Sequence, residues 1–317
     1  MQSLTQRQRE VLSTLIKLYL NWGEPVASAD IADALNHKWS SATIRKDLKI
    51  LEDMGFLEHP YKVAGRYPTV KAYRWFFDNL KYISLWDEES VRVFRNLVSH
   101  VRETAQVIQV LVRELAVSLH EMSLGTYVPT KAVVVDMVFP KVDDKYIVGL
   151  LLSTGEFVKK FVDLTEASQE VLLDIKKSII GCKLQDIYER RKIYPSWFRE
   201  LIINAMQVRI VESGIEYIID KADMSYGLRK FLSEIKNKER YIRIMAVANN
   251  PVVIFSEEIT DGKLKDWMMI LVDYTYKGLQ GLIGLVGPIR YNPERFFETL
   301  LAAQKALEED TDETSRT

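Results

Sequence analysis

The side chains best suited to contact a ligand gather in residues 40–49, which read SSATIRKDLK. The polar residues of this segment that could touch a phosphate group or the edge of a base are Ser40, Ser41, Thr43, Arg45, Lys46 and Lys49. Arginine suits guanine, hydroxyl groups suit phosphate, and the N-terminus of a helix favours a phosphate oxygen. Lys62 and Arg66 follow further along and could reach the flanking backbone or the minor groove. These residue types therefore favour binding of duplex DNA.

Three predicted helices position these side chains. The first covers residues 4–22 and the second is a short helix, ASADIADAL, that Ser28 caps. After the turn NHKWS, Ser40 or Ser41 caps a third helix, which ends at Gly55. The buried stripe of this third helix consists of Ile44, Leu48 and Leu51. This order of elements is typical of a helix-turn-helix, and it leaves the cationic residues on the outer face.

A hairpin is predicted directly after the third helix. In FLEHPYKVAGRYPTV, Gly65 and Pro68 permit a tight turn between two short extended runs, and helical spacing resumes over residues 70–82. Residues 1–82 hold 12 Lys and Arg against 9 Asp and Glu, a net charge of +3, whereas the whole chain has −1. A solvated polar face is the ordinary explanation of such a charged helix. A hairpin that follows a helix-turn-helix is called a wing, and the helix pair, this wing and the net positive charge of residues 1–82 together favour a DNA-binding domain.

The rest of the sequence predicts an α+β protein. Residues 87–124 form one predicted long helix with apolar residues three and four apart, a seam that could pair within the chain or between chains. Strand-like runs begin at KAVVVDMVF, KYIVGLLLS and GEFVKKFVDL, and a helix runs from Thr165 to Gly181. Further strands are expected at ERYIRIMAV, PVVIFSEEI, MMILVDYTY and LIGLVGPIR. Residues 192–238 favour helix, as though inserted, and the acidic end is expected to be disordered.

Other kinds of site find little support in the sequence. Cys182 is a lone cysteine, the four histidines fit no metal-ligand pattern, and the catalytic motifs GxSxG, CxxC and GxxxxGK[ST] do not occur. The glycines of GLQGLIGLVGP do not have the spacing of a nucleotide site, and close packing of a strand against a helix explains them better. We therefore expect no enzyme, no cofactor and no metal. Because the chain has no signal peptide and no apolar run long enough for a membrane span, we expect a cytoplasmic protein.

Three short motifs carry a resemblance to a known family. The run SSATIR at residues 40–45, with Asp47 and Gly55, resembles the recognition helix of the heat-inducible transcription repressor HrcA family. The segment AGRYPT at residues 64–69 is similar to the wing of that family, and GLIGLVGP at residues 281–288 is similar to its C-terminal run. The likeness lies at both ends of the chain and the order of elements between them agrees.

The resemblance implies a dimeric repressor with an N-terminal winged helix, a GAF-like domain and an inserted dimerisation segment. Its operator would be an inverted repeat upstream of chaperone genes, and the chaperonin GroEL would be a partner. On this basis we expect a winged-helix domain at 1–82, a long connecting helix at 83–125, a GAF-like domain at 126–191 and 239–306, a dimerisation segment at 192–238 and a disordered tail at 307–317. The alternative is a regulator whose GAF-like domain binds a small effector, with Tyr146, Phe157, Tyr274 and Tyr276 as lining residues.

Overall fold

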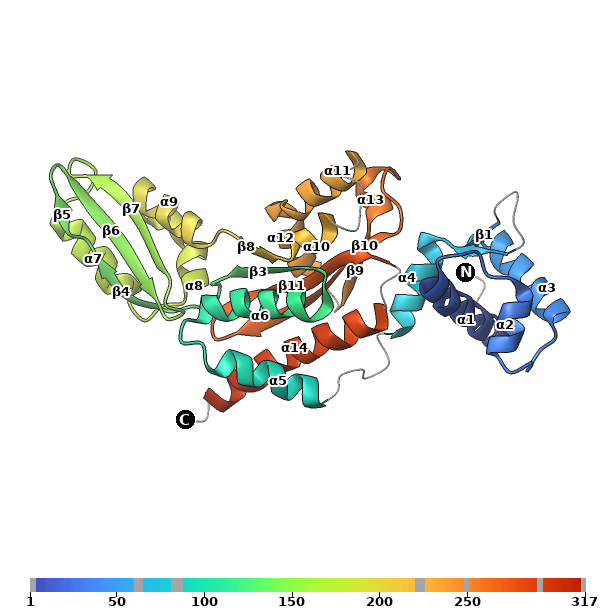
Figure 1. Ribbon diagram of the computed structural model, residues 1–317. Coiled ribbons are helices and arrows are strands. Elements are labelled where there is room, and N and C mark those ends of the chain that lie inside the picture. The colour runs from blue at the N-terminus through green and yellow to red at the C-terminus, as the bar shows by residue number, and fades with distance from the viewer. Residues whose placement is uncertain are drawn as a thin grey trace.

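A computed structural model describes residues 4–59, 65–80, 88–219, 226–247, 251–289 and 293–314. The chain forms three units in a row, with the N-terminal unit at one end, a central domain with a large sheet in the middle, and a second, smaller sheet with its own helices at the other end (Figure 1). No helix in the described ranges is both long enough and apolar enough to cross a lipid bilayer.

The N-terminal unit is a winged helix-turn-helix, as predicted. Helices α1 (Gln6–Trp22), α2 (Ser28–Ala34) and α3 (Ser41–Asp53) are followed by strands β1 (Leu57–Glu58) and β2 (Tyr67–Pro68) and by helix α4 (Val70–Leu80). The two short strands pair in antiparallel fashion. Gly23 ends α1 in the left-handed conformation, with φ of 73°, which glycine adopts without steric cost. Local sequence signals thus set the boundaries of this unit.

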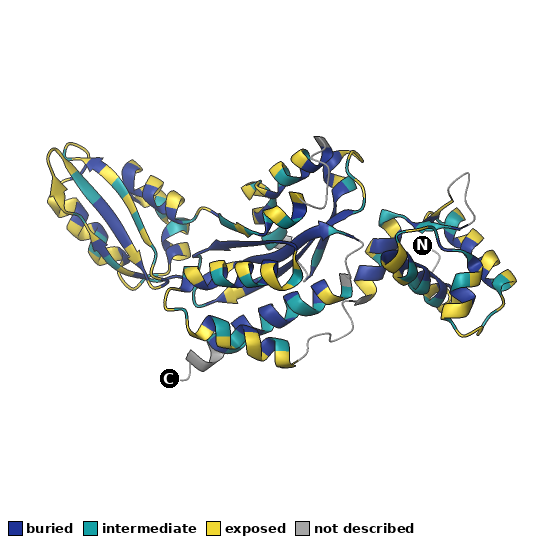
Figure 2. Cartoon of the chain, viewed as in Figure 1, coloured by how far each residue is buried: buried dark blue, intermediate teal, exposed yellow. Residues whose placement is uncertain are grey.

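The central domain is built on a five-stranded antiparallel sheet with the order β8-β3-β11-β10-β9. Its strands are β3 (Met122–Val128), β8 (Arg209–Ser213), β9 (Val252–Phe255), β10 (Trp267–Tyr276) and β11 (Leu279–Pro288). Helices α5 (Glu88–Ser99), α6 (Thr104–Leu119) and α14 (Pro293–Thr314) lie on one side of the sheet. Helices α10 (Ile215–Ile219), α11 (Tyr226–Ile235), α12 (Lys238–Val247) and α13 (Ser256–Thr260) lie on the other (Figure 1). Because both faces are covered, residues on both sides of β10 are buried (Figure 2).

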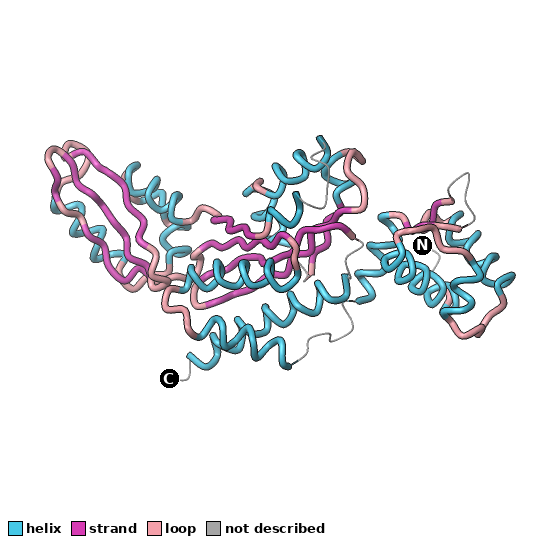
Figure 3. Tube along the Cα trace, in the orientation of Figure 1, coloured by secondary structure: helices cyan, strands magenta, loops and turns pink. Residues whose placement is uncertain are grey.

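The inserted unit leaves the central sheet after β3 and returns at β8 (Figure 3). It contains strands β4 (Val134–Val138), β5 (Lys141–Val142), β6 (Lys145–Leu152) and β7 (Phe157–Asp163). Its helices are α7 (Gln169–Ile179), α8 (Leu184–Glu189), a 3-10 turn at Arg191–Ile193, and α9 (Ser196–Ala205). These helices cover one face of the small sheet and enclose a separate hydrophobic core.

This arrangement differs from the expected division of the chain. The strands at 134–163 were expected in the central domain, but they form the separate sheet of the inserted unit. The expected inserted segment at 192–238 is split, because α9 packs in the inserted unit whereas β8, α10 and α11 belong to the central domain. Alternating apolar residues identify a strand but not the sheet that it joins. Whether the central domain is GAF-like stays a prediction.

The predicted long helix at 83–125 is wrong, because the chain forms two helices, α5 and α6, and then enters β3. At the end of α5 the Asn96 carbonyl accepts hydrogen bonds from Ser99 Oγ at 3.0 Å and lies 2.6 Å from His100 Nδ1, and Glu103 precedes the new helix. The two halves of the seam pack on different elements: α5 on α14, and α6 on the sheet. Most of the described part of the seam is therefore buried within the chain, and Val101, Ala105 and Leu119 are partly buried.

Three local predictions are also corrected. The run ERYIRIMAV forms helix α12 instead of a strand, with Tyr241, Ile244 and Met245 facing the core at helical spacing. Residues 307–314 continue α14 instead of forming a disordered tail, and residues 315–317 lie outside the described residues. The glycines at 281 and 284 lie close to carbonyl groups of neighbouring strands, so they serve packing between strands rather than packing of a strand on a helix.

Candidate nucleic-acid interface

Helix α3 has one buried face and one exposed face. Ile44, Leu48 and Leu51 are completely buried against the other helices of the unit. The exposed residues of the outer face are Ala42, Arg45, Lys46, Lys49, Ile50 and Asp53. An exposed helix that stands out from a small domain can enter the major groove, where residues near its N-terminus read base edges. The outer face has the required position and the required polar groups.

Hydroxyl groups hold the start of α3 in place. The Thr43 N–H donates to Ser40 Oγ at 3.2 Å, which makes Ser40 the capping residue, and the two side-chain oxygens lie 3.0 Å apart. Ser41 Oγ lies 2.9 Å from Ser28 Oγ, so Ser41 joins α3 to the start of α2. The predicted cap is confirmed. The serine and threonine hydroxyls thus have a structural role in addition to any contact with phosphate.

A buried carboxylate ties α3 to α1. Asp47 is completely buried, and Arg7 of α1 donates to its two oxygens at 2.6 and 3.2 Å. The hydrogen bond to Asp47 raises the pKa of Arg7, so the guanidinium is firmly charged. Sequence reasoning missed this pair as a positioning contact. The available signal was an acidic residue beside the apolar stripe of an otherwise basic helix, but nothing local identified the partner.

The three predicted cations of α3 differ in how freely their charge faces solvent. Lys49 Nζ lies 3.1 Å from both Glu52 and Asp53, and the hydrogen bonds to Asp53 and then to Glu52 raise the pKa of Lys49. Arg45 and Lys46 are exposed, and within the described ranges neither forms an ion pair. Positive charge is therefore concentrated in the N-terminal half of the outer face, while the C-terminal half is partly neutralised.

The wing residues predicted to touch DNA are placed less simply. Arg66 is only 15% exposed and its Nε donates to Glu52 at 2.8 Å, while its backbone pairs with Val26. Arg66 therefore ties the base of the wing to α3 and to the segment before α2. A phosphate contact from Arg66 would compete with this ion pair. Lys62 lies outside the described residues.

The residues named for an effector site do not meet. Tyr274 is buried and its hydroxyl donates to the Thr126 carbonyl at 2.9 Å, and the Tyr276 hydroxyl donates to Asp310 at 2.7 Å. Tyr146 and Phe157 belong to the inserted unit instead, where the Phe157 ring is half exposed. Among the residues with described positions, no cluster of three or more His, Cys, Asp or Glu side chains could hold a metal ion.

Comparison with known proteins agrees with this arrangement. Residues 3–79 match the model of the winged helix-turn-helix transcription repressor HrcA DNA-binding family, and residues 105–295 match that of the HrcA protein C-terminal domain. The heat-inducible transcription repressor HrcA of Natranaerobius thermophilus is 26% identical over 92% of this chain and 93% of its own length. That of Clostridium perfringens strain 13 is also 26% identical, over 96% of this chain and 98% of its own length.

A solved structure has the same fold over nearly the whole chain. It is described as the crystal structure of a hypothetical protein at 2.2 Å resolution, and it matches with a TM-score of 0.62 and 21% identity over 98% of this chain and all of its own length. The two family models together span the winged-helix unit and most of the rest of the sequence. The chain belongs to the HrcA family of heat-inducible transcription repressors.

Proposed function

We propose that the protein is a transcription repressor that binds a double-stranded DNA operator as a homodimer. The observation that carries this proposal is the exposed outer face of α3, with Arg45 and Lys46 exposed in its N-terminal half and without an ion pair to any described residue. The family is one of transcription repressors, so its description agrees with the expectation that the chain is not an enzyme.

The reading mechanism follows from the position of α3. Its N-terminal turns enter the major groove, where Arg45 reads a guanine and Thr43 and Lys46 assist. Exposed Ala42 adds a methyl group that can contact a thymine methyl. Lys49 and Lys62 contribute phosphate contacts, and Arg66 does so where a phosphate displaces its ion pair with Glu52. The hydroxyls of Ser40 and Ser41 lie at the helix start where a phosphate would bind.

An exposed sheet in the inserted unit supports the proposed dimer. Helices cover one face of this sheet. By the strand pairing, the other face carries the exposed side chains of Val138, Leu151, Phe157 and Phe161, with exposed Lys159 between the two phenylalanines, and Val135 at the bulge of β4 is exposed as well. Phe157 lies opposite Leu151 in the β6–β7 register and its ring covers Gly149. Several large apolar side chains exposed on one sheet face mark an interaction surface. A second copy of the same face is self-complementary about a two-fold axis, which is the symmetry of an inverted repeat.

The identity of the target genes and of the protein partner is proposed on the family resemblance. We place the operator upstream of chaperone genes and take the chaperonin GroEL as the partner that keeps the repressor active. The effector-sensing alternative is less favoured, because the four aromatic residues that would line its site lie in two different units.

Selection of bound fragments from the source genome tests the function. The full-length protein should enrich a small set of promoter fragments that contain an inverted repeat, with half-sites about 34 to 36 Å apart or a multiple of that distance. Protection from cleavage should cover both half-sites, and the same fragments should be repressed in a reporter strain. Enrichment of fragments without a common sequence would contradict the proposal, since it would indicate binding to phosphates alone.

A further inference from the structure

The winged-helix unit and the central domain share one hydrophobic core. Tyr73 and Phe77 of α4 are buried, and the Tyr73 ring lies 6.1 Å from the Phe255 ring at the end of β9. The Phe77 ring lies 6.2 Å from Phe255 and 6.0 Å from Phe297 of α14. We call these four rings the aromatic joint. Because packed rings do not slide freely, the joint holds α4 against the central sheet.

An ion pair between α4 and α13 lies beside the aromatic joint. Arg74 of α4 forms an ion pair with Glu258 of α13, and its guanidinium lies 5.4 Å from the centre of the Phe255 ring. The other carboxylate oxygen of Glu258 accepts a hydrogen bond from the Phe255 N–H at 3.1 Å. Glu258 therefore links the end of β9 to α4, and Arg74 contacts both the ring and the carboxylate.

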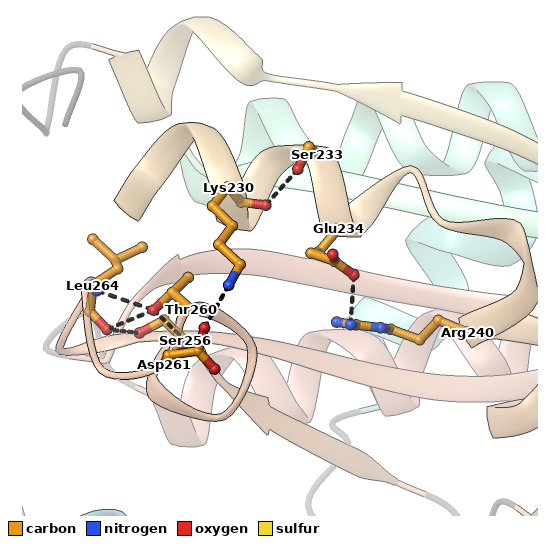
Figure 4. Close-up of polar contacts among 8 residues, drawn as sticks. All are labelled: Lys230, Ser233, Glu234, Arg240, Ser256, Thr260, Asp261 and Leu264. Carbon is orange, nitrogen blue, oxygen red and sulfur yellow. Dashed lines mark hydrogen bonds and ion pairs between the residues drawn. The ribbon is translucent and has the colours of Figure 1, made fainter. Parts of the chain in front are cut away.

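The short helix that carries Glu258 is itself rigidly held. Ser256 Oγ donates to the Leu264 carbonyl at 3.0 Å, and the Leu264 N–H donates to Thr260 Oγ1 at 3.0 Å (Figure 4). Both hydroxyl-bearing residues are completely buried. The α13 helix is thus fixed to the loop that leads into β10.

A second ion pair crosses the same boundary at a separate point. Lys17 of α1 lies 2.9 Å from Glu294 at the start of α14. Exposed pairs of this kind contribute little to stability one by one. Two pairs at separate points, together with a packed joint, nevertheless restrict the rotation of one body on another, because each pair breaks when the units turn.

We propose that Arg74 and Glu258 are positioning residues that set the direction in which each α3 helix faces, and so the half-site spacing that the dimer accepts. This inference rests on the proposed function, since spacing has a meaning only for a dimer on a two-part operator. Two rigidly oriented reading helices bind a correctly spaced operator with high effective concentration, whereas two loosely tethered ones gain less and tolerate wrong spacings.

The experiment compares DNA duplexes of one half-site with duplexes of two half-sites whose spacing varies one base pair at a time. The variants are Arg74→Glu, Glu258→Arg and the double exchange, which restores opposite charges. The matched control is Lys230→Ala, which removes a 2.7 Å ion pair with Asp261 inside the central domain (Figure 4). All are full-length proteins, and the affinity for each duplex is measured by fluorescence anisotropy.

Each single charge reversal should lower the affinity for the duplex with the best half-site spacing by about tenfold or more. The ratio of this affinity to the affinities for neighbouring spacings should become smaller. The affinity for a duplex with one half-site should stay within about twofold of that of the unmodified protein. The double exchange should recover most of the spacing preference, and the control should match the unmodified protein. Recovery by exchanged charges is not expected from a loss of folding.

Several results would overturn the inference. An equal loss on one half-site and on two would mean that the pair supports the fold of the reading unit and not its direction. An unchanged spacing profile in both reversals, or a flat profile in the unmodified protein, would mean that the joint does not set spacing. If the unmodified protein bound no selected half-site at all, the proposed function itself would fail, and that outcome is distinct from the others.

Discussion

Replacement of Arg45 by alanine tests the reading face most directly. Arg45 is exposed in the first turns of α3 and has no ion pair in the described part of the chain. The full strength of a contact with guanine is therefore available to DNA, and no ion pair between described residues is lost with the side chain. A good bidentate contact contributes roughly 1 to 3 kcal/mol of discrimination. For one half-site, Arg45→Ala should then weaken binding by about 5- to 150-fold.

On the proposed two-fold operator this effect should double. The proposed dimer would present two copies of Arg45, and contacts at well-separated sites add, so the loss on a complete operator should reach about 2 to 6 kcal/mol. Discrimination against an operator with the contacted guanine replaced should fall by a similar factor. Fluorescence anisotropy with one half-site, with the operator and with the base-substituted operator gives all three quantities at a fixed salt concentration.

Lys49→Ala and Lys46→Ala are the comparisons on the same helix. A full phosphate contact contributes about 0.9 to the slope of the logarithm of the binding constant against the logarithm of the salt concentration. Lys49 already pairs with Glu52 and Asp53, so Lys49→Ala should change this slope by less than that amount. Lys46 is exposed and assists Arg45 at the bases in the proposed mechanism, so Lys46→Ala should lower the discrimination between operator sequences more than it changes the salt dependence. The reasoning would be refuted if Arg45→Ala left operator affinity unchanged, or if Lys49→Ala removed more affinity than Arg45→Ala.

Three further perturbations test the dimer, the wing and the C-terminal helix. Phe161 lies on the exposed face of the sheet in the inserted unit and is 57% exposed, so Phe161→Lys should shift sedimentation from that of a dimer to that of a monomer. Val171→Lys, at an exposed position of α7, should not. Burial acts to raise the pKa of Glu52, but hydrogen bonds from two cations outweigh it and leave the pKa below its ordinary value. Ionised Glu52 should therefore stabilise the fold above about pH 4.5. In urea unfolding, the free energy of unfolding should be larger for the unmodified protein than for Glu52→Gln, and this difference should shrink as the pH falls through the pKa of Glu52 in the folded protein. Leu307→Ala should destabilise the protein by about 2 to 5 kcal/mol in the same assay, because Leu307 is completely buried. Glu308 is exposed, so Glu308→Ala should change stability by less than about 0.5 kcal/mol. Equal effects of the two substitutions would mean that this end of α14 is not packed.

Helix α3 was predictable because its determinants lie within a few residues. Ser40 caps the helix that it precedes, and Ile44, Leu48 and Leu51 form its buried stripe through spacing alone. Such patterns join residues three and four positions apart, so they can be recognised in the sequence of a helix without knowledge of the fold. The exposed cations followed from the same pattern, as the positions left over when the apolar stripe was turned inward.

Contacts between distant segments were decided by tertiary structure. The partner of Asp47 is Arg7 on another helix, and Arg74 meets Glu258, which lies 184 residues away. The seam at 91–122 read as one continuous helix, yet α5 and α6 pack on different elements and the chain breaks between them.

The sequence by itself determined which faces are apolar and where the N-terminal helices begin and end. Only the tertiary structure decided what covers each face, so the strands at 134–163 joined a sheet of their own and the run at 239–247 became a helix. The physical reason is that periodicity reports burial without naming the partner. The partner is chosen by packing and hydrogen bonding between segments far apart in the chain.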